Sequence, residues 1–250
     1  MMNKPMKHLF IFAHPDDETV ACAGTLHKLV AAREEVMVVS VTDGSGGEVN
    51  PEAQQRLAEL SSVGELRRDE LCEALKVVGV NNYKVLKFQD GKITNEMVWG
   101  ELRSALIDLI DGYKPDAVYT FDHSGWYFHL DHVATSIATT WAVQQAAFPP
   151  QIFFLVHFRV KNTKWKYVYS KDIPATHVVD VTDLKALKLE ALAKHLSQNL
   201  TEPKRQLQEE KRVLEYYQLA AFSPDGFEAS EKALQGHWLF QPVDRKPGEA

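Results

Sequence analysis

The strongest constraint on the fold is a regular alternation of short apolar runs and amphipathic segments along the first 158 residues. Apolar runs, several rich in β-branched side chains, predict strands at Lys7–Ala13, Val36–Val41, Tyr83–Phe88, Ala117–Phe121 and Ile152–Val156. Apolar residues at helical spacing predict helices at Asp17–Arg33, Val63–Val78, around Met97–Ile110, and at Val133–Ala146. Strands that alternate with helices make right-handed crossovers, so the sequence predicts an α/β fold with a parallel sheet covered on both faces.

The pattern becomes less regular beyond Phe158. Strands are predicted at Lys166–Tyr169 and His177–Val181, helices at Leu184–Leu196 and Lys204–Tyr217, and a polar tail from Gln241. We expect a single domain over residues 1–250, in which 1–158 form the parallel core and 159–250 pack on it.

Composition excludes several classes of protein. The chain has 250 residues, of which 45% are hydrophobic and 25% charged, as in an ordinary globular enzyme. A net charge of -6 argues against binding to nucleic acid, because phosphates require clustered Lys and Arg. The first apolar run is too short for a signal peptide or a membrane span, and Cys22 and Cys72 do not form a disulfide framework. We therefore expect a cytoplasmic protein without a transmembrane segment, and a homo-oligomer stays open.

Polar side chains gather after two of the predicted strands. The segment 14–18, HPDDE, follows the first strand, and the segment 122–132, DHSGWYFHLDH, follows the fourth. In an open parallel sheet, ligands bind at the carboxyl ends of the strands where the strand order reverses, and the first strand commonly lies beside that point. We expect the two loops to face each other across it.

The residue types in these loops favour a metal cation. A dinucleotide-binding loop needs glycines where this chain has a histidine and three acids, which attract a cation instead. Two histidines and one acid are a usual ligand set of hydrolytic zinc, with one position left for water. His14, a neighbouring acid and a histidine of the second loop supply such a set. The alternative is an exposed acidic turn in which Asp16 or Asp17 caps the next helix.

These motifs resemble those of the PIG-L (LmbE-like) N-acetylglucosaminyl deacetylase family. The resemblance is carried by AHPDDE at 13–18, TDG at 42–44, the stretch 67–70 and HLDH at 129–132, with a fainter likeness in KLEALAKHLSQ at 188–198. Leu130 replaces the usual proline of the family, and the DHSGWYFH loop lacks the family's proline and small residues.

The resemblance implies a Rossmann-like, three-layer fold with a mostly parallel sheet and helices on both faces. It implies that His14, Asp17 and His132 bind Zn²⁺, with Fe²⁺ or another divalent metal as alternatives. Asp16 is then the general base that takes a proton from metal-activated water. The implied substrate is a small N-acetylated sugar or sugar conjugate, from which the enzyme removes the acetyl group.

The resemblance also implies roles for the second loop. His129 and Tyr127 match positions that assist the oxyanion or the leaving group, and Asp131 matches one that orients a histidine. Either Asp16 or His129 could deliver the proton that the departing amine needs, and the sequence does not choose between them.

Two further residues carry both a functional and a structural interpretation. Arg67 matches a position associated with substrate recognition, but it could also pair with Glu70 one helical turn away. Trp126 could stack on a sugar ring, or it could anchor its loop as a buried aromatic residue.

Two rival functions remain at this point. A non-haem iron enzyme could use the pair His129 and Asp131, completed by a distant His157, His177 or His195, although such enzymes are usually rich in β-structure. A non-catalytic sugar-binding protein could keep the same fold with an inactive site.

Overall fold

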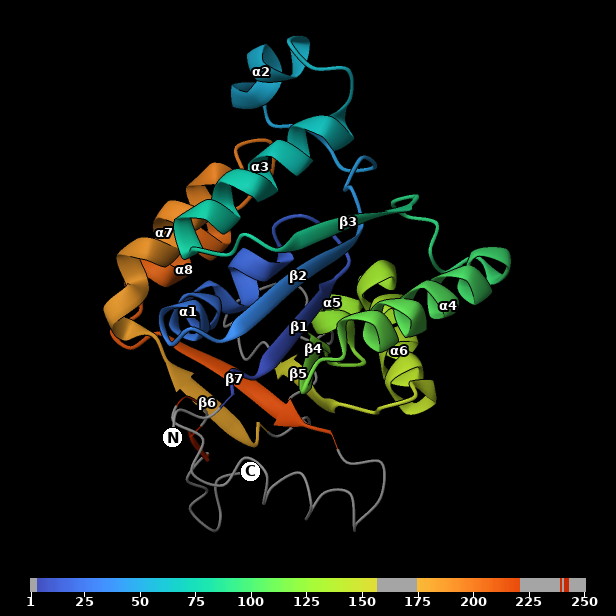
Figure 1. The fold of residues 1–250 in the computed structure, drawn as a ribbon. Helices are drawn as coiled ribbons and strands as arrows, with labels where there is room; N and C mark the ends of the chain where they lie inside the picture. The colour runs from blue at the N-terminus through green and yellow to red at the C-terminus, as the bar shows by residue number, and fades with distance from the viewer. Residues whose placement is uncertain (1–3, 157–174, 221–238, 240, 243–250) are drawn as a thin grey trace.

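The described part of the chain folds around one eight-stranded sheet with helices on both faces. The structure is a computed structural model that describes residues 4–156, 175–220, 239 and 241–242. The strands follow the order β3-β2-β1-β4-β5-β7-β6-β8 (Figure 1). The predicted three-layer α/β fold is therefore confirmed.

The parallel half of the sheet contains all five strands predicted before Phe158. They are β1 (Lys7–Phe12), β2 (Glu35–Thr42), β3 (Tyr83–Phe88), β4 (Ala117–Phe121) and β5 (Gln151–Val156). β1 lies between β2 and β4, and His8 pairs in register with Val36 on one side and Ala117 on the other. The chain moves outward from β1 to β3 and then returns to β4, so the strand order reverses between β1 and β4.

Helices cover the two faces of the sheet in separate groups (Figure 1). One face carries α1 (Asp17–Ala31), α3 (Val63–Val78), α7 (Lys185–Lys194) and α8 (Thr201–Glu209). The other carries α4 (Glu96–Tyr113) and α6 (Leu130–Gln145). Short helices at α2 (Gln54–Ala58) and α5 (Gly125–Phe128) lie in the loops that follow β2 and β4.

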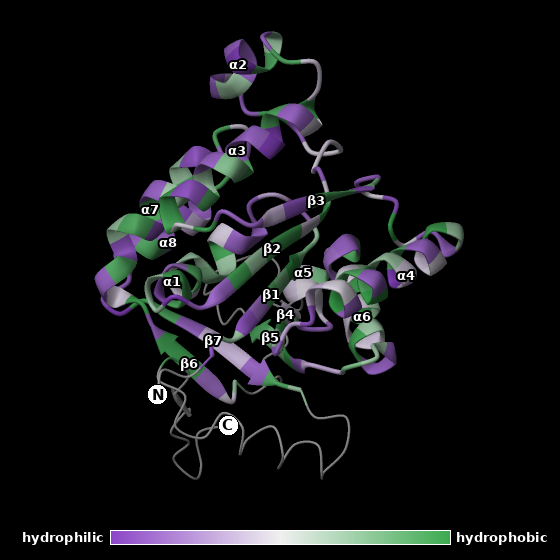
Figure 2. Ribbon diagram, viewed as in Figure 1, coloured by the Kyte–Doolittle hydropathy of each residue, from purple (hydrophilic) through white to green (hydrophobic). Residues whose placement is uncertain are grey.

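Alternate residues of the central strand supply two hydrophobic cores. Phe10 and Phe12 belong to the cluster formed with α1, α3 and α7, whereas Leu9 and Ile11 belong to the cluster formed with α4 and α6. A strand buried on both faces reads as a continuous apolar run, because neither set of alternate side chains meets water. Figure 2 shows this apolar character along the central strands and mixed character on the outer helices.

The C-terminal part extends the sheet with antiparallel strands, and here one prediction is wrong. Instead of one helix over Lys204–Tyr217, the chain forms α8, which ends at Glu209, and then β7 (Leu214–Leu219). Residues along β7 alternate between buried and half-buried, and β7 pairs with β5 and with β6 (His177–Asp180). β8 (Gln241–Pro242) pairs with β6 within the predicted polar tail. The predicted strand Lys166–Tyr169 lies outside the described residues.

A buried ion pair joins β7 to a kink in α1. At Cys22 the backbone of α1 leaves helical geometry, with φ -147° and ψ 24°. The Glu215 carboxylate accepts hydrogen bonds from the N–H groups of Gly24 and Thr25, just after the kink, at 3.1 and 2.8 Å. Lys188 Nζ donates to Glu215 Oε1 at 2.6 Å, and both side chains are buried.

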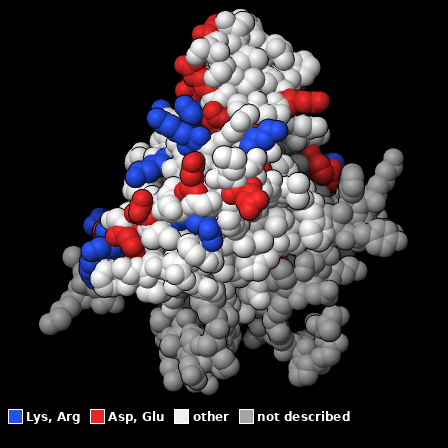
Figure 3. Space-filling model, turned by 90° about the vertical axis from the view of Figure 1, so that its right-hand side faces the viewer, with Lys and Arg blue, Asp and Glu red and all other residues white. Residues whose placement is uncertain are grey.

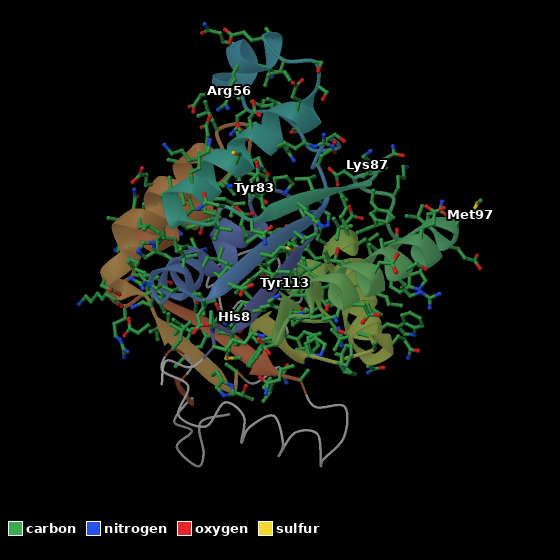
Figure 4. The ribbon with its side chains drawn as sticks, in the orientation of Figure 1. His8, Arg56, Tyr83, Lys87, Met97 and Tyr113 are labelled. Carbon is green, nitrogen blue, oxygen red and sulfur yellow. The ribbon has the colours of Figure 1, made fainter. Side chains whose placement is uncertain are left out.

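His8 has a structural role in the sheet. It lies near the amino end of β1 (Figure 4) and is fully buried. Its Nδ1 lies 2.9 Å from Tyr119 Oη. The amino end of β1 is the end away from the two polar loops.

On the face in Figure 3, basic side chains lie among acidic ones. Among the helices that the structure describes, none combines the length and the hydropathy needed to span a membrane. Cys22 is buried, Cys72 is half-buried, and both are free thiols.

Candidate metal centre

The point of strand reversal brings the two polar loops together, as predicted. His14 follows β1, and His132 lies in the first turn of α6 after β4. Their ring nitrogens, His14 Nδ1 and His132 Nε2, lie 3.2 Å apart although 118 positions separate the residues. Asp17, in the first turn of α1, lies 3.2 Å from His132 Nε2 through its Oδ1 and 3.6 Å from His14 Nδ1 through its Oδ2.

These separations fit a tetrahedral metal ion. Ligand atoms at ~2.0–2.1 Å from a tetrahedral zinc lie about 3.3 to 3.4 Å from one another. The distances from His132 Nε2 to His14 Nδ1 and to Asp17 Oδ1 are both 3.2 Å, and the 3.6 Å distance from His14 Nδ1 is measured to the other oxygen of the same carboxylate, Oδ2. The donor set of two imidazoles and one carboxylate also suits zinc or ferrous iron. His129 places a ring nitrogen within 4.8 Å of those of His14 and His132.

Charge in the cluster is arranged for a cation. Burial would raise the pKa of Asp17, but the charge of His132 and hydrogen bonds from His132 and His14 hold this pKa well below its usual range. Burial disfavours the charged form of His14, yet hydrogen bonds to Asp131, Asp17 and Asp90 raise its pKa well above the ordinary value. Without a cation, a proton on His14 offsets part of the negative charge of the carboxylates.

Asp90 belongs to the site and was not predicted. Its Oδ1 lies 3.0 Å from His14 Nε2, and its Oδ2 accepts a hydrogen bond from Gly46 N at 2.8 Å. Asp131 Oδ2 lies 3.2 Å from the same ring nitrogen and accepts from Gly91 N at 2.7 Å. Two carboxylates thus flank the side of His14 that faces away from Asp17. The one signal in the sequence is that Asp90 follows β3, another strand that ends at this edge of the sheet.

Asp16 is held in an unusual backbone conformation beside the cluster. Its φ of 118° lies in the region that non-glycine residues avoid, at a cost of about 1–3 kcal/mol. Burial and the negative charge of Asp17 raise the pKa of Asp16 to about 8. A carboxylate with a pKa near the working pH suits a group that first takes up and later releases a proton.

The loop with α5 packs closely over His132. The backbone of Gly125 has φ 59°, and a Cβ there would lie 2.8 Å from Val133 N, so only glycine fits. Trp126 is 4% exposed, donates from Nε1 to Leu155 O at 3.0 Å, and packs its ring edge-on to His132. These contacts favour the anchoring interpretation of Trp126, which also borders the cavity.

Two side chains of this loop lie over the cluster on the cavity side. Tyr127 is 47% exposed, and its ring centroid lies 5.3 Å from that of His132. His129 Nδ1 accepts a hydrogen bond from Asp131 N at 3.3 Å, which leaves Nε2 as the protonated nitrogen of a neutral ring. Burial and the charges of His132 and His14 lower the pKa of His129 and favour that neutral form.

Arg67 also lines the cavity at the site. It is buried and donates from Nη2 to Glu48 O at 3.1 Å, while its Nε meets no hydrogen-bond partner among the described residues. A Cβ on Gly47 would lie 2.5 Å from Arg67 Nη2, so the glycine loop lets the guanidinium approach. Glu70 accepts from Ser197 N and Oγ at 2.8 and 2.6 Å instead of pairing with Arg67.

The iron-enzyme alternative finds no support in the geometry. His177 lies on β6, and His195 contacts Glu18 and Thr19 behind the HPDDE loop. In the described ranges, neither belongs to a group of side chains that could hold a metal ion. His157 lies outside the described residues.

A cavity of about 930 Å³ opens over the cluster. His14, Asp16, Asp17 and Asp90 border it on the sheet side, and it continues between α1, α7 and α8. Its volume lies within the range of pockets that hold small molecules.

Fold and site together define a Rossmann-like α/β protein with a histidine and carboxylate cluster at the switch point of its sheet. A family model described as "GlcNAc-PI de-N-acetylase" (PIG-L) matches residues 9–143. The chain belongs to this family, as its motifs predict.

Individual relatives agree with this assignment. A 1D-myo-inositol 2-acetamido-2-deoxy-alpha-D-glucopyranoside deacetylase of Mycobacterium sp. (strain KMS) is 31% identical over 225 residues, which cover 76% of this chain and 73% of the relative. The structure of N,N'-diacetylchitobiose deacetylase from Pyrococcus horikoshii matches with a TM-score of 0.66 and 23% identity, over 88% of this chain and 87% of that chain.

The fold by itself does not fix the reaction. GalB, a 4-carboxy-2-hydroxymuconate hydratase from Pseudomonas putida KT2440, matches with the same TM-score of 0.66 at 15% identity, over 87% of this chain and 97% of that chain. The reaction therefore depends on the side chains of the site and not on the fold alone.

Proposed function

We propose that the protein is a metal-dependent N-deacetylase that hydrolyses the acetamide of a small N-acetylglucosamine-containing conjugate. The observation that carries the proposal is the convergence of His14 Nδ1, His132 Nε2 and the Asp17 carboxylate at separations close to those of tetrahedral metal ligands. Membership of a de-N-acetylase family supports the same chemistry.

His14, Asp17 and His132 would hold the cation, with Zn²⁺ or Fe²⁺ as the candidates. When bound, such an ion lowers the pKa of water and polarises the acyl oxygen. Asp131 and Asp90 fix the ring of His14 from behind, so that its Nδ1 faces Asp17 and His132.

Asp16 would accept a proton from the attacking water. It lies next to the ligand Asp17 but borders the cavity, and its carboxyl has a pKa of about 8 in the absence of a cation. The positive charge of an ion on Asp17 would lower this pKa toward neutrality. The same carboxyl can then return the proton to the departing amine.

His129 and Tyr127 would bind the oxyanion that develops on the acyl oxygen. Neutral His129 has its proton on Nε2, because Nδ1 accepts from the Asp131 backbone. It is therefore better suited to donate a hydrogen bond than to act as a charged acid, which leaves Asp16 as the general acid. Removal of one such donor costs about 2.7–4 kcal/mol in comparable sites.

Substrate recognition would fall to Arg67. Arg67 lines the cavity with buried donor groups, which suits hydroxyl or acidic groups of a sugar conjugate. The relatives named for a 2-acetamido-2-deoxyglucoside of inositol and for diacetylchitobiose indicate the substrate class to try first.

The test is an amine-release assay with metal-free protein. The panel comprises N-acetylglucosamine, N,N'-diacetylchitobiose and N-acetylglucosaminyl inositol, each with one equivalent of Zn²⁺ or, without oxygen, Fe²⁺. We expect amine release that requires the metal and stops with chelator. Turnover that survives complete removal of metal refutes the proposal, and so does the absence of amine release from every substrate of the panel with either metal.

Two substitutions separate the roles of the adjacent acids. Asp17→Asn should abolish stoichiometric metal binding, whereas Asp16→Asn should keep one metal per chain and lower the rate by about 10²–10⁴-fold. Asp116→Asn is the matched control, because Asp116 lies just before β4, at the opposite end of the sheet, and accepts from Lys7 N. Equal metal loss in the Asp16 and Asp17 variants would contradict the assignment.

A further inference from the structure

A buried segment after α7 contacts the back of the HPDDE loop. His195 and Ser197 are fully buried and Gln198 is 8% exposed, although all three are polar. Buried polar side chains persist where they make specific hydrogen bonds. Those of His195 and Gln198 converge on Asp16 and its neighbours.

The peptide group that joins Pro15 to Asp16 is held at both of its ends. Gln198 Nε2 donates to the carbonyl oxygen of Pro15 at 2.7 Å. The N–H of Asp16, on the same peptide group, donates to Glu18 Oε2 at 3.1 Å. Rotation of this peptide plane would change the φ angle of Asp16. The two hydrogen bonds therefore hold φ at 118°, a value that is unfavourable for an aspartate.

His195 connects the two holding groups. Its Nε2 lies 3.3 Å from Glu18 Oε1, and its Nδ1 lies 3.3 Å from Gln198 Nε2. The amide nitrogen of Gln198 is a donor, so His195 Nδ1 accepts and its Nε2–H donates to Glu18. In this chain of hydrogen bonds, which runs from Gln198 through His195 to Glu18, each N–H donor thus meets an acceptor.

The segment itself is fixed from the side opposite the loop. Ser197 donates from its backbone N and its Oγ to Glu70 of α3. Asn50 Nδ2 donates to Leu196 O and Gln198 O at 3.2 and 2.7 Å. Gln198 therefore acts from a rigid base.

We propose that Gln198 and His195 are positioning residues that lock the Pro15–Asp16 peptide group and so aim the Asp16 carboxylate at the reacting water. This inference rests on the proposed function for the role of Asp16. Neither residue needs to touch the reacting atoms, because a displaced base loses rate even when the metal and the substrate are bound normally.

The test is the variant Gln198→Met, which keeps the length of the side chain and removes both donors. We expect kcat to fall by about 10- to 100-fold, with KM within about twofold of the original and one metal per chain retained. In the metal-free protein, hydrogen exchange of the Asp16 amide should become at least about tenfold faster, because its partner Glu18 is no longer aligned.

Two comparisons control for loss of stability. Thr25→Val removes a hydroxyl that is equally buried and hydrogen-bonded elsewhere in α1, and it should leave kcat and Asp16 exchange unchanged. His195→Gln retains a donor toward Glu18 and should keep most of kcat, whereas His195→Leu should lose as much as Gln198→Met.

The outcomes separate this inference from the proposed function. If the unmodified protein releases no amine, the proposed function fails, and the exchange rate of Asp16 still tests the locked peptide. If the unmodified protein is active but Gln198→Met keeps its kcat, raises only KM, or loses metal in parallel, the positioning role is refuted.

Discussion

The substitution Glu215→Gln tests whether the buried ion pair stabilises the kinked helix α1. Glu215 accepts four hydrogen bonds: from Lys188 Nζ at 2.6 Å, from Gly24 N at 3.1 Å, and from Thr25 N and Oγ1 at 2.8 and 2.6 Å. A glutamine would leave the Lys188 charge without a partner, which costs about 3–5 kcal/mol when the pair is buried. Its amide would also turn one acceptor into a donor, so we expect a loss at the upper end of that range.

The double variant Lys188→Met with Glu215→Gln separates charge from packing. The double variant has no unpaired charge and keeps one carbonyl acceptor for the α1 backbone. Its loss in the free energy of unfolding should therefore be about 2 kcal/mol smaller than the sum of the losses in the two single variants. The measurement is urea denaturation of metal-free protein, followed by both fluorescence and circular dichroism so that coincident curves justify a two-state fit. Strictly additive losses would show that the two side chains do not interact in the folded protein.

Three further outcomes can be measured on the same protein. Zn²⁺ or Fe²⁺ at about 100 times its Kd should add about 2.7 kcal/mol to the free energy of unfolding. For a chain of this size, that gain raises Tm by about 5–11 °C. If the same rise in Tm persists in Asp17→Asn, the metal binds elsewhere. Trp126→Phe should cost about 1–3 kcal/mol by leaving Leu155 O unpaired, with KM within about twofold; a large rise in KM would instead indicate stacking on the substrate. Hydrogen bonds from Thr182 and Arg212 lower the pKa of Asp180 to about 2, so its stabilising contribution is present above about pH 4 and is lost as the pH falls toward 2. Because this pair is exposed, Asp180→Asn should cost less than about 1 kcal/mol near pH 6, and the difference should shrink in acid rather than grow.

The sequence predicted the parallel half of the fold because its signals there are local. The α3 helix runs over Val63–Val78 as predicted, since Ser62 caps its first turn by accepting from Glu65 N and Gly79 follows its last residue. The meeting of the two polar loops was predictable for a related reason. β1 and β4 are parallel neighbours in the sheet, so the polar residues that follow them meet at the same edge. This holds whatever the sequence of the chain that connects the two strands.

The elements that were missed depend on partners far away in the chain. Apolar residues over 204–217 fit helical spacing, but pairing with β5, some sixty positions earlier, makes the second half of this range a strand. Asp90 belongs to none of the sequence motifs, and only its 3.0 Å distance to His14 reveals its place in the site. The bonds from Gln198 to the loop after β1 cross 183 positions, and no spacing rule anticipates them.

The balance of charge around His14 favours the binding of a divalent cation. Three buried or half-buried carboxylates, Asp17, Asp90 and Asp131, contact only two imidazoles, those of His14 and His132. In metal-free protein a proton on His14 offsets part of the excess, which is why hydrogen bonds to the three acids raise the pKa of that ring. One proton carries a single charge, whereas a divalent cation neutralises two carboxylates and frees the ring nitrogens to act as ligands. Metal binding must therefore release a proton from this cluster, and the affinity for metal must rise with pH until His14 is fully deprotonated.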